Sequence, residues 1–255
     1  MIYDLEKKIV LVCSGDTDLG MACISAFLKE KATVYTSTKS KKSFKELANK
    51  YLKDSFSKKK LTVINADIAT ESGRKKCLSK CSDPDILINH YPGPSAKHFL
   101  ELKISDWMEA LNNCLILNLE MTKKVISGMN KRKFGRIINI SSISVLHPIQ
   151  NLELSTVARS GLEGYIKSVA RKEIFKYVTI NNLLPGYFMT TALENHLNSF
   201  HKKDRKKKID EILVNIPVKR FGDPKEFAEI CCFLASKKGG YIHGQTIQVS
   251  GGQYI

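Results

Sequence analysis

The feature that most constrains the fold is a regular alternation of short apolar runs with longer amphipathic segments. Runs such as "KIVLVC" (8–13) have the length and composition of buried strands, whereas segments such as 18–31 repeat apolar residues at helical spacing. The pattern predicts strands over 8–13, 33–37, 61–67, 85–89, 135–141, 178–186 and 244–249. Helices are predicted over 18–31, 42–53, 71–80, 105–130, 155–175 and 224–236, with Ser105 as the N-cap of the fourth.

Helices that connect strands in this way form right-handed crossovers between parallel strands. The sequence therefore predicts the α/β class: one Rossmann-like domain over 1–255, with a doubly wound parallel sheet and helices on both faces. Ligands of such sheets bind beyond the carboxyl ends of the strands, so we expect the functional residues in the loops there.

The composition is that of a soluble globular protein, with 43% apolar and 26% charged residues among 255. No apolar run has the length that a membrane span needs. The N-terminal segment "MIYDLEKKIVLVC" is too short and too charged before its apolar run for a signal peptide. The sequence therefore predicts a cytoplasmic protein that does not enter a membrane.

The formal net charge of +16 raises the question of nucleic acid or another acidic partner. Lysines gather in "SKKK" (57–60) and "HKKDRKKK" (201–208), but neither run has interleaved aromatic residues or a nucleic-acid motif. A lysine-rich solvated surface is therefore favoured over nucleic-acid binding. A basic interaction protein on this fold stays open as a minor reading.

Seven cysteines without Cys-x-x-Cys spacing argue against a disulfide framework and against a zinc site. Cys77 and Cys81 lie one helical turn apart, which could hold a metal but is more often ordinary helix packing. We therefore predict no metal site.

Four stretches carry a resemblance to a known family. They are "GRIINISS" (135–142), "GLEGYIKSVARK" (161–172), "INNLLPGYFMTT" (180–191) and "PVKRFGDPKEFAEICCFLASKKGGYIHGQTIQVSGGQ" (217–253). With them the whole chain resembles the short-chain dehydrogenase/reductase family, in particular its 3-oxoacyl-(acyl-carrier-protein) reductase-like branch. The resemblance implies an oxidoreductase that uses NADP or NAD on a small-molecule carbonyl or alcohol substrate and that assembles as a homotetramer or dimer.

The family's cofactor loop, Thr-Gly-x-x-x-Gly-x-Gly, corresponds to "CSGDTDLG" (13–20). Ser14 and Asp18 stand at its first two glycine positions, only Gly20 aligns, and Gly15 comes one residue late. A carboxylate at 18 suits a helix N-terminus but opposes a diphosphate. The alternative is that Asp16 or Asp18 caps the helix and that a dinucleotide binds weakly or not at all. The resemblance implies that the cofactor's phosphates lie against Ser14, Gly15, Thr17, Asp18, Leu19 and Gly20.

The end of the second predicted strand, "STKSKK" (37–42), bears on the choice of cofactor. NAD enzymes place an acid there for the ribose 2′-hydroxyl, whereas this chain has Thr38 followed by Lys39. Hydroxyl and ammonium groups suit a 2′-phosphate, so NADP is predicted over NAD; an exposed lysine cluster is the alternative. The resemblance adds further cofactor contacts at Asp67, Ile68, Asn89, Pro185, Gly186 and Thr190.

The family's catalytic tyrosine, and the lysine four residues later, are absent. Their positions hold Ser155 and Arg159, the family's serine is present as Ser142, and its asparagine position falls at Cys114. A serine hydroxyl is a much weaker acid than a phenol, whereas Arg159 can still hold ribose hydroxyls.

Another residue could therefore supply the proton. Tyr187, Tyr91 and His147 lie where the family's substrate pocket should be, although each could equally be a packing or surface residue. Tyr165 is less favoured, because it lies ten residues beyond Ser155 on the same helix.

A basic insert at about 190–216 matches the family's substrate lid by position. Its charge could attract an acidic substrate, although a solvated helix face is favoured.

The sequence thus favours an NADP-preferring oxidoreductase with the usual Tyr and Lys replaced by Ser155 and Arg159. The alternative is a catalytically inactive scaffold or regulatory subunit that binds a nucleotide or metabolite.

Overall fold

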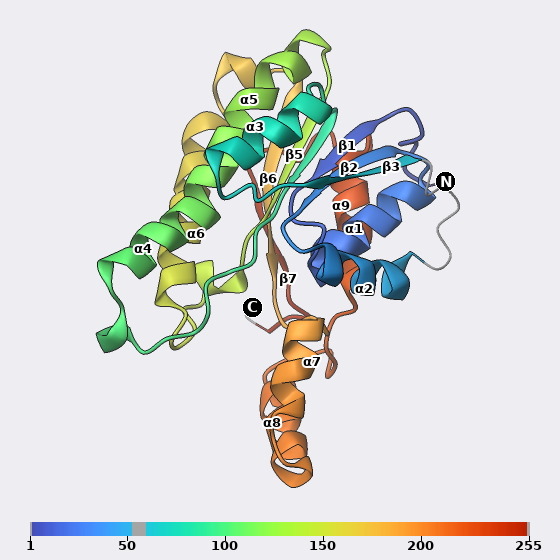
Figure 1. Cartoon of the computed structure of the whole chain (residues 1–255). Helices are drawn as coiled ribbons and strands as arrows, with labels where there is room; N and C mark the ends of the chain where they lie inside the picture. The colour runs from blue at the N-terminus through green and yellow to red at the C-terminus, as the bar shows by residue number, and fades with distance from the viewer. Residues whose placement is uncertain (1, 53–59, 254–255) are drawn as a thin grey trace.

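The computed structural model describes residues 2–52 and 60–253, and within them it has a seven-stranded parallel sheet (Figure 1). The strands are β1 (Ile9–Val12), β2 (Thr33–Thr38), β3 (Leu61–Asn65), β4 (Ile86–Asn89), β5 (Gly135–Ile140), β6 (Val178–Pro185) and β7 (Thr246–Val249). Their order is β3-β2-β1-β4-β5-β6-β7, and every neighbouring pair is parallel. The strand order reverses between β1 and β4, which is where such sheets bind ligands.

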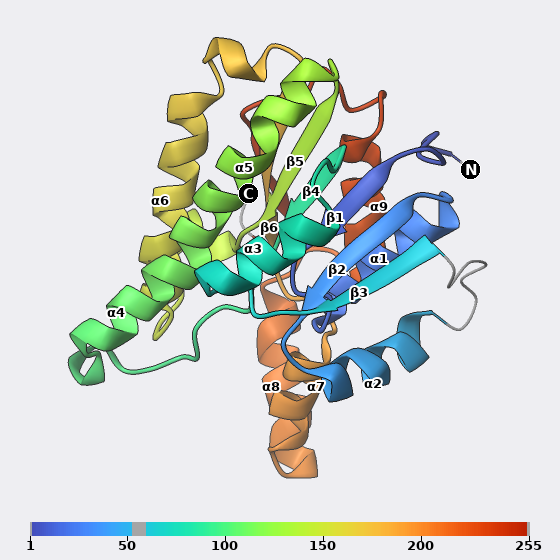
Figure 2. The same cartoon turned by 45° about the horizontal axis from the view of Figure 1, so that its top comes forward.

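Helices cover both faces of the sheet, as the alternation predicts. They are α1 (Asp18–Lys29), α2 (Lys41–Tyr51), α3 (Glu71–Lys80), α4 (Ile104–Leu111), α5 (Leu117–Lys131), α6 (Glu153–Val169), α7 (Thr191–Asn198), α8 (Lys202–Val214) and α9 (Pro224–Ala235). Helices α1, α2 and α9 lie on one face and α3, α5 and α6 on the other (Figures 1 and 2). The pair α7 and α8 extends away from the sheet beyond the end of β6 (Figure 1).

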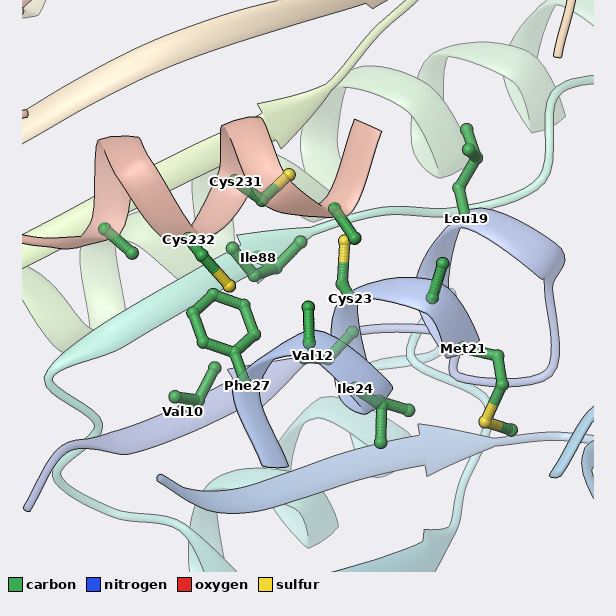
Figure 3. Close-up of a cluster of buried hydrophobic side chains, with 14 of the residues drawn as sticks. Val10, Val12, Leu19, Met21, Cys23, Ile24, Phe27, Ile88, Cys231 and Cys232 are labelled. Carbon is green, nitrogen blue, oxygen red and sulfur yellow. The ribbon is translucent and has the colours of Figure 1, made fainter. Parts of the chain in front are cut away.

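Helix α1 fixes the geometry of the loop after β1, because every residue from Asp18 to Leu28 is buried and the helix packs against the sheet and α9. Phe27 and Cys23 pack there against Cys231 and Cys232 of α9 (Figure 3). The thiols in the described residues are free and buried, and burial raises the pKa of Cys77 to about 11 and of Cys81 to about 12. These cysteines therefore act as small apolar core residues.

The long helix predicted over 105–130 differs from the structure in two respects. It begins at Ile104, and the carboxylate of Asp106 accepts the N–H of Lys103 at 2.8 Å, so the prediction of Ser105 as N-cap is wrong. It is also interrupted by a π-helical turn, Asn112–Ile116, between α4 and α5. Such turns rotate the residues after them relative to a regular helix, so they change which side chains face a site.

The other predicted elements are present with small shifts at their ends. The helix predicted over 155–175 ends at Val169 and is followed by a short 3-10 turn, Glu173–Phe175. Residue 53 of one predicted helix and residues 57–59 of one basic run lie outside the described residues. Among the described helices, none has both the length and the apolar character needed to cross a membrane.

Candidate active site

The loop after β1 turns tightly at the carboxyl edge of the sheet and is tied to β2. Ser14 has a φ of 52°, a left-handed conformation that costs a non-glycine residue roughly 1 kcal/mol. Its N–H donates to the hydroxyl of Ser37, and the N–H of Gly15 donates to the carbonyl of Ser37, both at 2.9 Å. At Gly20 a Cβ atom would lie 2.4 Å from the carbonyl oxygen of Ser14, so the aligned glycine is needed for this turn.

Helix α1 is capped by Thr17, so the prediction that Asp16 or Asp18 caps it is wrong. The hydroxyl of Thr17 accepts the N–H of Gly20 at 3.1 Å and donates to the carbonyl of Ser14 at 3.0 Å. Both aspartates are therefore left to bind other groups, and Leu19 packs into the core behind them.

Asp18 points toward α2 and α7. Its carboxylate accepts the N–H and the hydroxyl of Thr191, at 2.9 and 3.1 Å, and the hydroxyl of Tyr51 at 2.9 Å. Lys50 lies 3.2 Å away and supplies the opposite charge. The residue is only 7% exposed, so it joins the starts of α1 and α7 to the end of α2 as a buried anion.

Asp16 points toward the end of β2 instead. Its Oδ2 atom accepts the hydroxyl of Thr38 at 2.9 Å and the N–H groups of Lys39 and Ser40, each at 3.1 Å. A carboxylate from the loop after β1 thus lies at the strand end where the family's acid belongs in NAD enzymes, although Thr38 itself is not acidic.

Tyr91 connects the end of β2 to the segment after β3. Its hydroxyl donates to Oδ1 of Asp67 at 3.1 Å and accepts from the ammonium of Lys39 at 3.2 Å. The hydrogen bond to Tyr91 raises the pKa of Lys39, so the amine keeps its charge. These side chains and the buried Ile68 line a cavity of about 130 Å³, which has the position of an adenosine pocket.

Ser155 and Arg159 are in contact on α6, because i and i+4 residues share one face of a helix. The Nε–H of Arg159 donates to Ser155 Oγ at 3.2 Å. Its other nitrogens donate to the carbonyls of Ile140, at 2.9 Å, and Tyr91, at 3.4 Å. A guanidinium carries five N–H donors, so two remain after these three bonds. A Cβ at Gly93 would lie 3.5 Å from Nη2 of Arg159, so the loop after β4 closes directly over the pair.

The charge of Arg159 is not balanced by a carboxylate in any ion pair among the described residues. Its neighbour His90 is buried, and burial, with a smaller contribution from the Arg159 charge, lowers the pKa of His90 to about 3. The His90 Nδ1 atom has no hydrogen-bond partner in the described part of the chain. The imidazole is therefore neutral, and Arg159 presents an uncompensated positive charge to this edge of the sheet.

A second cavity, of about 360 Å³, is also lined by Tyr91, together with Gly93, Leu154 and Asn113 among others. Cys114, which occupies the family's asparagine position, is 1% exposed and packs with Leu154. Asn113 was missed because the π-helical turn cannot be recognised from helical spacing. The doubled asparagine at 112–113 was the available signal.

Of the predicted catalytic residues and alternative proton donors, only Tyr91 is among the residues that line this cavity, and Ser155 and Arg159 are not. Ser142 caps the 3-10 turn Ile143–Val145, where its Oγ accepts the N–H of Ser144 at 3.2 Å. His147 is half-buried just after that turn, and its N–H donates to the carbonyl of Ile143. Tyr187 lines a separate cavity of about 240 Å³.

Hydrogen bonds and close packing fix the residues at the ends of β4 and β6 and just beyond β6. The side-chain amide of Asn89 donates to Oδ1 of Asn139 at 2.8 Å, whereas its own buried oxygen has no partner in the described residues. Pro185 ends β6, and a Cβ at Gly186 would lie 2.9 Å from the Cα of Ser250. Thr190 accepts the N–H of Leu193 at 3.3 Å, at the start of α7.

These groups fit an adenine dinucleotide in most respects. The cavity of about 130 Å³, the N-terminus of α1 and the two remaining donors of Arg159 lie along one edge of the sheet. The orphaned oxygen of Asn89 adds a buried acceptor there. The exception is the end of β2, where Asp16 holds the donors that would receive a 2′-phosphate.

Comparisons with known proteins agree with the fold and the motifs. Residues 15–253 match the family model described as Enoyl-(Acyl carrier protein) reductase. The chain is 30% identical to the 3-oxoacyl-(acyl-carrier-protein) reductase FabG of Vibrio harveyi over 252 residues, 99% of each chain. It is 32% identical to the acetoacetyl-CoA reductase of Cupriavidus necator over 187 residues, 73% of each.

Among solved structures, L-sorbose reductase from Gluconobacter frateurii, complexed with NADPH and L-sorbose, is similar with a TM-score of 0.89. It covers 99% of this chain and 98% of its own at 22% identity, so it bears on the fold alone.

Proposed function

Because the chain belongs to the short-chain dehydrogenase/reductase family, we propose that it is an oxidoreductase acting on a carbonyl or alcohol substrate. The observation that carries this proposal is the Ser155–Arg159 contact on α6, which keeps a hydroxyl beside a cation at the ligand-binding edge. The similarity to reductases of 3-oxoacyl and acetoacetyl thioesters supports a 3-oxoacyl thioester as the substrate class.

The two residues have complementary roles in this proposal. A nicotinamide dinucleotide, when bound, supplies or accepts the hydride. The Oγ lone pair of Ser155 accepts the Arg159 N–H, which leaves the hydroxyl proton for donation to the substrate oxygen. The positive charge of Arg159 stabilises negative charge that develops on Oγ, and its remaining donors hold the ribose. Ser142 positions the substrate oxygen, and His147 and Tyr187 remain alternative proton donors.

The proposed cofactor is NADP(H) in preference to NAD(H). The hydroxyl of Thr38 and the charged amine of Lys39 at the end of β2 support this preference. Asp67 and Ile68 hold the adenine, and Asn89, Pro185, Gly186 and Thr190 surround the nicotinamide end. The loop from Ser14 to Gly20 lies against the phosphates through its main chain.

A second candidate is a catalytically inactive scaffold or regulatory subunit that binds a nucleotide or metabolite. It is favoured by the burial of Ser155 and Arg159, which are 6% and 5% exposed, and by the main-chain carbonyls that already hold Arg159. In this reading the pair is a structural relic that supports the loop after β4.

Turnover measurements distinguish the two candidates. We expect wild-type protein to oxidise NADPH with acetoacetyl-CoA, followed by absorbance, and Ser155→Ala to lower kcat by about 10²-fold or more with little change in dinucleotide affinity. Arg159→Met should weaken dinucleotide binding. Ser168→Ala, on an exposed turn of the same helix, is the matched control and should leave both quantities unchanged.

Two results would count against an active oxidoreductase. Dinucleotide binding without turnover on any 3-oxoacyl or simple carbonyl substrate would favour the inactive scaffold. The absence of dinucleotide binding at millimolar concentration would contradict the oxidoreductase proposal.

Further parts of the proposal concern assembly and the insert. Exposed apolar residues on and before α4, including Leu100, Ile104 and Met108, support a homodimer or homotetramer.

We propose that the insert over about 190–216, which forms α7 and α8, is the lid of a single-domain enzyme, and that its exposed lysines favour an acidic substrate. A cytoplasmic location stays a prediction from the sequence.

A further inference from the structure

The end of β2 has a group of hydrogen-bond donors suited to an anion, and the carboxylate of Asp16 occupies it. Three donors converge on one oxygen, Oδ2 of Asp16: the hydroxyl of Thr38 and the N–H groups of Lys39 and Ser40, at 2.9 to 3.1 Å. Asp16 is partly exposed rather than buried, and it lines the cavity of about 130 Å³, so its carboxylate is held at the rim of that cavity.

Two further features make this place attractive to a negative charge. Helix α2 begins at Lys41, directly after Ser40, so its N-terminal dipole points at the same donors. The charged amine of Lys39 lies on the same rim, held by Tyr91. Without Asp16, the same donors, dipole and amine would form a cradle for a phosphate group.

We propose that Asp16 limits the preference for NADP(H) over NAD(H) that Thr38 and Lys39 favour, because its own negative charge occupies this cradle. A 2′-hydroxyl can bind beside the carboxylate and donate to its other oxygen, Oδ1. A 2′-phosphate must displace Asp16 from three hydrogen bonds and then lie next to it. The inference rests on the dinucleotide binding proposed above.

Asp16 therefore opposes the preference for NADP(H) that the sequence predicts from the strand-end residues alone. Lys39 attracts a 2′-phosphate, whereas Asp16 repels it and competes for the same donors. Specificity of this kind is set by a repulsive group as much as by an attractive one.

Removing the charge while keeping the shape tests the inference. Asp16→Asn retains an oxygen that can accept the three donors, and Asp16→Ser removes the group altogether. Glu46→Gln, on an exposed part of α2, removes one negative charge from the same region and is the matched control. Calorimetric titrations with NADPH and NADH, and with adenosine 2′,5′-bisphosphate and adenosine 5′-phosphate as fragments, give the affinities without requiring turnover.

Both Asp16 variants should bind NADPH and the bisphosphate at least about tenfold more tightly than wild type, because a like charge at contact distance is removed. The affinities for NADH and for adenosine 5′-phosphate should fall or stay unchanged, because both variants lose the charged acceptor of the 2′-hydroxyl. All four affinities of Glu46→Gln should change by less than about twofold. Thermal melts confirm that each variant is folded.

Equal shifts for the phosphorylated and unphosphorylated ligands, or weaker NADPH binding in Asp16→Asn, would overturn the inference while leaving the proposed function intact. If none of the proteins binds any of the four ligands, the inference and the dinucleotide proposal both fail.

Discussion

Replacing Asp18 by alanine tests what a carboxylate does at the second glycine position of the family's cofactor loop. In the structure this carboxylate accepts hydrogen bonds from Tyr51 and from both the N–H and the hydroxyl of Thr191, and it pairs with Lys50. The substitution leaves these donors without an acceptor at the junction of α1, α2 and α7. We therefore expect the chain to lose stability and the start of α7 to loosen.

The magnitude follows from burial. Asp18 is 7% exposed, whereas Lys50 is 45% exposed and can be solvated by water after the substitution. The loss therefore comes mainly from the orphaned hydroxyl of the buried Tyr51 and from the two donors of the half-buried Thr191, each of which costs about 1 kcal/mol. Together they predict a decrease of about 3 kcal/mol in the free energy of unfolding.

Urea unfolding followed by circular dichroism measures this difference. Asp83→Ala is the matched control, because Asp83 is 63% exposed and pairs with Arg132 at 2.7 Å; it should cost less than about 1 kcal/mol. An Asp18→Ala variant no less stable than Asp83→Ala would refute the argument that Asp18 is a buried structural anion.

Three other substitutions test the site. Tyr91→Ala frees Oδ1 of Asp67 for a ligand, so dinucleotide affinity measured by calorimetry should rise about fivefold, the equivalent of one hydrogen bond; weaker binding would show that Tyr91 contacts the ligand. His90 has a folded pKa of about 3 against 6.5 in its ordinary state, so the unfolded chain takes up the proton first and stability falls as the pH drops from 6.5 toward 3. His90→Gln should reduce that fall in urea unfolding, and an unchanged pH dependence would contradict the buried neutral imidazole. Ser155→Tyr combined with Arg159→Lys should raise reductase activity by about 10²-fold; no gain in a variant that binds cofactor would count against a carbonyl site.

The fold was predictable because its signal is distributed over the whole chain. Each buried strand reads as a short apolar run, and a single substitution does not change the pattern. The ends of elements were harder, since they depend on individual hydrogen bonds. Ser105 was predicted as an N-cap from its residue type, whereas the Asp106 carboxylate holds the N–H of Lys103 and starts the helix one residue earlier.

The site was predictable only where a family motif fixes the register. The contact between Ser155 and Arg159 follows from their spacing on one helix. The partners of Asp16 and Asp18 could not be predicted, because they come from Ser40 and Thr191, which are distant in the sequence. Local reasoning offered helix capping by Asp16 or Asp18 as the alternative to cofactor binding, whereas Thr17 is the N-cap.

The contacts around Tyr91 were likewise not predictable from the sequence. Tyr91 was considered as a proton donor from its position, and in the structure its hydroxyl joins Lys39 to Asp67, a contact that position alone does not reveal. Asn113 could not be predicted to line the neighbouring cavity, since that depends on the π-helical turn at 112–116.

The central claim is that a nicotinamide dinucleotide binds at the carboxyl edge of this sheet, and Trp107 allows a direct test. It is the one tryptophan in the sequence, and it lies on α4 next to residues that line the larger cavity. Titration with NADH or NADPH, with excitation of Trp107 and detection of nicotinamide emission, should give a saturable sensitised signal that Trp107→Phe abolishes. No sensitised emission at millimolar dinucleotide would contradict the claim, and the Ser155–Arg159 pair would then be a structural remnant.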